Sequence, residues 1–151
     1  CLSSNGGIDG MIIGQAIDCY FENQKLELNQ LEFLHIHKTA KLIAASLKMG
    51  AIICEYDLQI QEKLFNFGIN LGLLFQIQDD IIDETCTSVQ AGKTTHNDSS
   101  KNSFVNLLGL DGSIKSADDL ALKCLETLNT FDSNLKESLE QLLLEYINRH
   151  K

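Results

Sequence analysis

The 151-residue sequence contains no proline and no tryptophan. Proline removes a backbone donor and interrupts helices, so its absence, together with abundant Leu, Ile and Ala, favours long uninterrupted helices. No apolar run approaches the roughly 18 residues that a membrane-spanning helix needs, and no signal-peptide pattern is present. We therefore expect an all-α fold and a single domain over 1–151, without membrane anchoring.

Basic residues are scarce, with 12 Lys and Arg against 21 Asp and Glu and a net charge of −9. This balance argues against nucleic acid or an anionic membrane as the main partner, since both are bound through a surplus of basic residues. The cysteines are odd in number, widely spaced and without a C-x-x-C pair: Cys1, Cys19, Cys54, Cys86 and Cys124. That usage is typical of a reducing compartment, and we expect a cytoplasmic protein.

An apolar helix that ends in acids is the most informative stretch of the sequence. At about 100° per residue, the side chains of Asp79, Asp80 and Asp83 fall within an arc of about 100°. Such like charges repel one another at the end of an apolar run, and a cation relieves the repulsion. Oxygen ligands without His or Cys suit Mg²⁺ or Ca²⁺, and Mg²⁺ completes its shell with water and phosphate oxygens. A solvated acidic helix end is the alternative.

Three more residues share that face of the helix, namely Gln76, Gly72 and Gly68. Two glycines one turn apart cost roughly 1 kcal/mol each in helix propensity. We therefore expect that something approaches the helix backbone closely at this point.

Lys38 falls within an apolar stripe of a helix expected over 30–54. The stripe consists of Leu31, Leu34, Leu42, Ala45 and Met49. Because the opposite face is also apolar, the ammonium either meets an anion or snorkels to water. We favour a bound anion. On the preceding helix, expected over 8–21, Gln15 and Asp18 either line a ligand cavity or hydrogen-bond a neighbouring helix.

The remaining pattern predicts an opening loop over 1–7 and further helices over 56–84 and 104–110. After a turn at Gly112, two more helices begin at Ser116 and Ser133. The polar, aperiodic stretch over 85–103 is longer than most loops of compact domains. It contains Lys93 and Lys101, which could fold back over a metal-bound diphosphate; a solvated loop is the alternative.

The nine residues from Phe75 to Asp83, FQIQDDIID, resemble the second aspartate-rich motif of the trans-type prenyl diphosphate synthases, which include farnesyl and geranyl diphosphate synthases. The resemblance covers most of the chain, and it corresponds to the C-terminal half of that family. It implies the C-terminal half of an isoprenoid synthase helical bundle. Further matches stand in the family's order: Gly14-Gln15, Asp18, His37-Lys38-Thr39, Gly92-Lys93, Asp98, Lys101 and Leu107-Leu108-Gly109.

The resemblance implies a Mg²⁺-dependent prenyltransferase of isoprenoid biosynthesis that acts as a homodimer. Such an enzyme condenses isopentenyl diphosphate with an allylic diphosphate, dimethylallyl or geranyl diphosphate, and releases pyrophosphate. The metal ligands implied are Asp79, Asp80 and Asp83. The residues implied to bind the allylic substrate are Lys38, Thr39, Gln76, Lys93 and Lys101, of which Lys38, Thr39 and Gln76 are implied to act in catalysis.

The sequence also departs from the family's pattern. The family's first aspartate-rich motif and the basic residues that hold isopentenyl diphosphate have no match in these 151 residues. We therefore expect the chain alone to be half an active site and inactive by itself. Three other interpretations are a non-catalytic regulatory subunit of a heteromeric synthase, a terpene cyclase, and an acidic helical interaction module.

Overall fold

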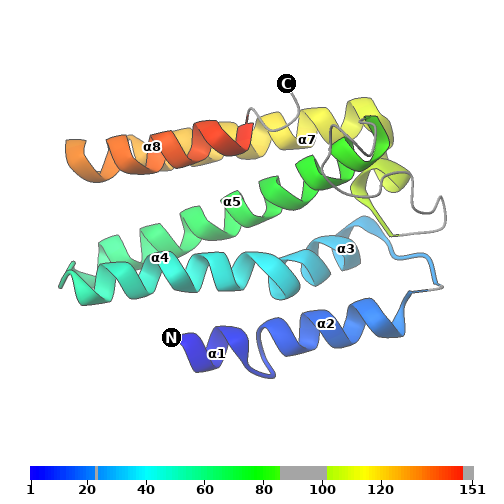
Figure 1. Ribbon diagram of the computed structural model, residues 1–151, viewed down its shortest axis with the longest axis horizontal. Helices are drawn as coiled ribbons and strands as arrows, with labels where there is room; N and C mark the ends of the chain where they lie inside the picture. Colours follow the sequence, from blue (N-terminus) through cyan, green and yellow to red (C-terminus); the bar gives the residue numbers. More distant parts are fainter. Residues whose placement is uncertain (23, 86–101, 148–151) are drawn as a thin grey trace.

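The computed structural model describes residues 1–22, 24–85 and 102–147, and none of these residues lies in a β-strand. The all-α prediction is confirmed. Figure 1 shows the long helices side by side, in an order that follows the chain from α2 through α4 and α5 to α7 and α8. The elements are α1 (Leu2–Gly6), α2 (Met11–Tyr20), α3 (Leu28–His35), η1 (Ile36–Ala40), α4 (Lys41–Ile53), α5 (Leu58–Thr85), α7 (Phe104–Leu128) and α8 (Ser133–Ile147).

Helix α5 lies at the centre of the bundle, with α4 on one side and α7 on the other. Its observed span, Leu58–Thr85, agrees with the helix predicted over 56–84. Four consecutive residues of the helix, 71–74, are buried, so it is buried on more than one side. Its most deeply buried side chains are Phe67, Leu71, Leu74, Gln78 and Ile77. No helix in the described part of the chain is long and apolar enough to cross a membrane.

Gly68 and Gly72 let α5 touch its neighbour along the backbone. A Cβ atom added at Gly68 would lie 2.5 Å from the Cα of Ala44, and one added at Gly72 would lie 2.5 Å from the Cα of Ala40. The predicted close approach is therefore confirmed. The partner is the adjacent helix, and the contact fixes the depth at which η1 and α4 pack on α5.

A π-helical turn, η1, interrupts the helix that was predicted to run regularly over 30–54. His35 is buried, and the next buried residue is Ala40. This five-residue spacing is that of a π-turn. The extra residue rotates every later side chain, and beyond Leu34 the predicted stripe holds only in part, since Ala45 is buried. Leu42 and Met49 are only partly buried.

The π-turn lies where α2 packs closely against it. A Cβ atom added at Gly14 of α2 would lie 2.2 Å from the backbone nitrogen of Lys38. Helix α2 therefore packs directly against the backbone of η1. Gly14, which matches the family's pattern, therefore makes room for this contact.

Two other helix boundaries differ from the predictions. The opening was expected to be a loop, but Leu2–Gly6 forms the short helix α1. The break between the two helices expected around Gly112 lies at Gly109 instead, where φ is 73°. Glycine adopts that left-handed conformation without a steric penalty. Ser116 therefore lies inside α7, which begins after the N-cap residue Ser103.

Candidate functional site

Thr39 and Gln76 are in direct contact across the η1–α5 interface. The Thr39 hydroxyl donates a hydrogen bond of 2.7 Å to Gln76 Oε1, and the bond is partly buried. Thr39 comes from the π-helical turn, and Gln76 lies one turn of α5 before the acids. These two residues are 37 positions apart in the sequence, and they were predicted to share one role. The fold brings them together. Their role in catalysis stays a prediction.

Lys38 forms an ion pair with Asp18 of α2. The Lys38 Nζ lies 2.6 Å from Asp18 Oδ2, and the two side chains are 33% and 39% exposed. The prediction of a lysine in the middle of a buried stripe is therefore wrong, because the π-turn moves this side chain to the rim of the interface. At such exposure an ion pair contributes at most about 1 kcal/mol. The pair orients the ammonium while leaving it accessible to a stronger anion.

The three acids lie half-buried at the C-terminal end of α5. Asp80 Oδ2 accepts a hydrogen bond of 2.8 Å from the backbone N–H of Phe104, the first residue of α7. A helix N-terminus carries N–H groups without intrahelical partners and a partial positive charge, so it stabilises a carboxylate there. One carboxylate oxygen of Asp80 is thereby fixed in direction.

The phenyl ring of Phe104 makes a second contact at the same point. It stacks on the imidazole of His35 with a centroid separation of 5.4 Å, and both side chains are buried. The other histidine, His37, lies on Phe33 with a centroid separation of 3.9 Å. Its Nδ1–H donates to the Phe33 carbonyl oxygen at 2.8 Å. Each histidine therefore has a packing role of its own.

The carboxylate oxygens of these acids suit Mg²⁺, but they do not form a complete metal-binding site by themselves. Among the residues that the structure describes, no three His, Cys, Asp or Glu side chains converge where a metal ion could sit. Mg²⁺ commonly takes only one or two protein carboxylates and fills its octahedron with water and phosphate oxygens. The carboxylates of α5 therefore fit a Mg²⁺ ion that binds together with a diphosphate.

Two of the predicted substrate ligands, Lys93 and Lys101, lie outside the described residues. The described chain resumes at Asn102, whose side chain bonds to the connection between α2 and α3. Ser103 follows, and its Oγ accepts a hydrogen bond of 3.1 Å from the N–H of Asn106. Sequence reasoning missed Asn102, because its partners are backbone atoms about 80 residues away and no local pattern marks it.

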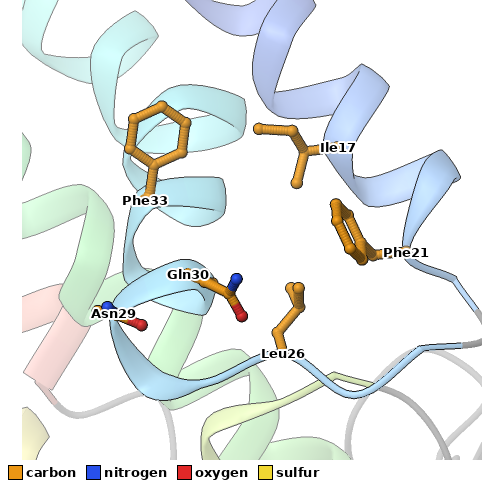
Figure 2. Close-up of a pocket in the computed structure, with 6 residues that line it drawn as sticks. All are labelled: Ile17, Phe21, Leu26, Asn29, Gln30 and Phe33. Carbon is orange, nitrogen blue, oxygen red and sulfur yellow. The ribbon is translucent and has the colours of Figure 1, made fainter.

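A cavity of about 310 Å³ lies between α2 and the start of α3. Figure 2 shows Ile17 of α2 and Phe21, the residue that follows α2, reaching towards α3, with Leu26 closing the space from the connection below. The remaining lining residues come from α3: Asn29, Gln30 and Phe33. The walls are mostly apolar, and the connection that carries Leu26 is the one held by Asn102.

Comparison with known proteins identifies the family. The family model described as polyprenyl synthetase matches residues 5–142. The chain belongs to the polyprenyl synthetase family. It is 38% identical to the farnesyl diphosphate synthase of Micrococcus luteus, over 99% of this chain and 52% of that protein. It is 40% identical to the chloroplastic geranylgeranyl pyrophosphate synthase of Catharanthus roseus, over 83% of this chain and 36% of that protein.

Solved structures of the polyprenyl synthetase family have the same fold. A geranyltransferase from Helicobacter pylori, complexed with magnesium and isoprenyl diphosphate, is 51% identical with a TM-score of 0.86, over 95% of this chain and 48% of that chain. A polyprenyl synthase from Caulobacter crescentus is 22% identical with a TM-score of 0.82, over 93% of this chain and 55% of that chain, and this likeness concerns the fold alone. The chain spans between 36% and 55% of the length of these relatives. The predicted family and helical bundle are confirmed.

Proposed function

We propose that the protein containing this chain is a short-chain prenyl diphosphate synthase. It condenses isopentenyl diphosphate with an allylic diphosphate and releases pyrophosphate. The observation that carries the proposal is the Thr39–Gln76 hydrogen bond of 2.7 Å, which joins the lysine-bearing η1 to the acid-bearing helix α5. Relatives named farnesyl and geranylgeranyl diphosphate synthases support it.

In this proposal the carboxylates of Asp79, Asp80 and Asp83 hold Mg²⁺, which when bound neutralises charge on the diphosphate. Lys38 binds the diphosphate of the allylic substrate, exchanging its partner Asp18 for a phosphate oxygen. As the allylic C–O bond breaks, its electron pair leaves with pyrophosphate, and the ammonium stabilises the charge that develops there. Lys93 and Lys101 add to this binding on the strength of the family resemblance.

Thr39 and Gln76 act on the organic part of the substrate. Their mutual hydrogen bond fixes the Thr39 hydroxyl as donor, so its oxygen lone pairs remain available to a developing positive charge. Dipoles that are already oriented stabilise a cation without the cost of reorganising solvent. The side chains therefore direct the allylic cation towards the double bond of isopentenyl diphosphate.

The protein is proposed to act as a cytoplasmic homodimer.

A two-substrate assay on the full-length protein tests the proposal. Pyrophosphate should be released, with a longer prenyl diphosphate as product, only when isopentenyl diphosphate, an allylic diphosphate and Mg²⁺ are all present. A chelator should abolish the reaction, and added Mg²⁺ should restore it. Release of pyrophosphate from the allylic substrate alone would instead indicate a cyclase, and no release with any allylic substrate would indicate a non-catalytic subunit.

A further inference from the structure

We propose that Asn102 is a positioning residue for the diphosphate site. It acts through the N-terminus of α7, whose first N–H holds the carboxylate of Asp80. The inference rests on the proposed function, since it assumes that Asp80 serves a metal-bound diphosphate.

The side-chain amide of Asn102 makes three hydrogen bonds to one short connection. Its Oδ1 accepts from the N–H of Leu26 at 2.9 Å, and its Nδ2 donates to the carbonyl oxygens of Phe21 at 3.1 Å and Gln24 at 2.8 Å. Every bond is to backbone atoms, 76 to 81 residues away in the sequence. One side chain therefore fixes the position of the α2–α3 connection relative to the start of α7.

The chemistry of these bonds selects a side-chain amide. Two acceptors and one donor must be satisfied together, and a primary amide offers both functions from one end. Aspartate keeps the acceptor but cannot donate to the two carbonyl oxygens, which it would repel. Loss of the amide leaves the N–H of Leu26 and the carbonyl oxygen of Gln24 without this partner, whereas the carbonyl oxygen of Phe21 keeps its hydrogen bond of 3.0 Å from the N–H of Gln24. Backbone groups without partners inside a protein are costly.

The connection and α7 each adjoin a residue that orients one side chain of the candidate site. Phe21 follows α2 directly, three residues after Asp18, the partner of Lys38. Phe104 stands two residues after Asn102 and donates its N–H to Asp80 over 2.8 Å. Asn102 therefore links the element that orients the lysine to the element that orients a carboxylate.

A first measurement concerns the protein without ligand. In Asn102→Asp, the amide of Phe104 should exchange with deuterium several-fold faster in full-length protein free of Mg²⁺, because its N–H no longer stays on Asp80. Peptides from α8 should be unchanged. Equal exchange at Phe104 in the variant and the wild type would overturn the inference.

The second measurement concerns binding. Calorimetry with inorganic pyrophosphate and Mg²⁺, well below the melting temperature, should show roughly tenfold weaker binding for Asn102→Asp. The Mg²⁺ concentration for half-maximal synthase activity should rise in parallel. Asn66→Asp is the matched control, since it makes the same chemical change on an exposed side chain of α5, about 21 Å along the helix from Asp80. It should bind as the wild type does.

The outcomes separate the two claims. Wild-type protein that fails to bind pyrophosphate with Mg²⁺ overturns the proposed function and this inference together. Wild-type binding that Asn102→Asp leaves unchanged overturns the inference alone, and so does a lowered melting temperature with an unaltered Mg²⁺ requirement. If Asn102→Asp does not fold, Asn102→Ser is measured instead, with the same weaker binding and higher Mg²⁺ requirement expected and the same result overturning the inference.

Discussion

The ammonium of Lys38 lies 2.6 Å from the carboxylate of Asp18, so a lysine for which the sequence favoured an anionic partner has one within the protein. The pairing explains how the side chain keeps its direction before a substrate arrives. Because both side chains are about one-third exposed, the pair is screened by water and is weak enough to exchange.

Replacing Lys38 with methionine should therefore affect binding far more than folding. The free energy of unfolding should change by less than about 1 kcal/mol, since an exposed ion pair contributes no more than that. Affinity for an allylic diphosphate analogue with Mg²⁺ should fall roughly ten- to hundredfold, because a charge-assisted hydrogen bond is lost. Calorimetric titration and urea denaturation of the full-length protein measure the two effects.

Lys48→Met is the control for this change. Lys48 lies on α4, and its ammonium also pairs with a carboxylate, that of Glu62 on α5. The substitution removes an equivalent ion pair away from the site, and affinity should stay at the wild-type value. Equal affinities for Lys38→Met and the wild type would show that Lys38 does not bind the diphosphate.

Gly72→Ala should destabilise the protein although alanine favours helices. The new Cβ would lie 2.5 Å from the Cα of Ala40 and 2.6 Å from its Cβ, so the two helices must separate. We expect a loss of about 1–3 kcal/mol from overpacking. Gly50→Ala on α4 is the control, because no atom lies within 4 Å of its added Cβ, and it should gain up to about 1 kcal/mol. If urea denaturation shows both variants to be more stable than the wild type, the close packing of Gly72 on Ala40 is contradicted.

Stability should fall at high pH because of Cys124. Burial in the α7 core raises the pKa of this thiol from 9.0 to about 12. Between these values the folded protein keeps the proton and the unfolded chain releases it, so unfolding is favoured by up to about 1.4 kcal/mol per pH unit. Below pH 9 the thiol is protonated in both the folded and the unfolded state, so this destabilisation is absent.

The Cys124→Ala variant isolates this effect from other groups that titrate in the same range. At neutral pH the wild type should be the more stable protein, since alanine leaves a cavity. Its advantage should shrink steadily above pH 9 in urea denaturation under reducing conditions. A constant difference between pH 7 and pH 10 would mean that the thiol is not held protonated.

Those elements that depend on periodic apolar residues could be predicted from the sequence. Helix α5 was placed within two residues at each end, and the start of α8 at Ser133 was found. Within α5, the arc shared by Gln76 and Asp79 follows from helical geometry alone. The contact of Gly72 with a neighbouring backbone could also be predicted, because two glycines one turn apart weaken a helix unless another element packs closely against them.

Elements that depend on distant contacts could not be predicted. The local sequence predicts a regular helix at the π-turn, and the close contact of Gly14 on α2 with the backbone of Lys38 joins residues far apart in the sequence. The rotation that follows moved Lys38 from the core to the rim and gave it Asp18 as a partner. Asn102 forms hydrogen bonds with backbone atoms of the α2–α3 connection, so no sequence pattern near Asn102 reveals its role.

The central claim is that the carboxylates at the end of α5 bind a diphosphate through Mg²⁺. Its most direct test is calorimetric binding of pyrophosphate to the full-length protein, with and without Mg²⁺, for the wild type and for Asp79→Asn. The wild type should bind only with Mg²⁺, and Asp79→Asn should bind at least tenfold more weakly while melting at the same or a higher temperature without metal, because one of three repelling charges is gone. Binding that is equal in the two proteins at saturating Mg²⁺ would contradict the account.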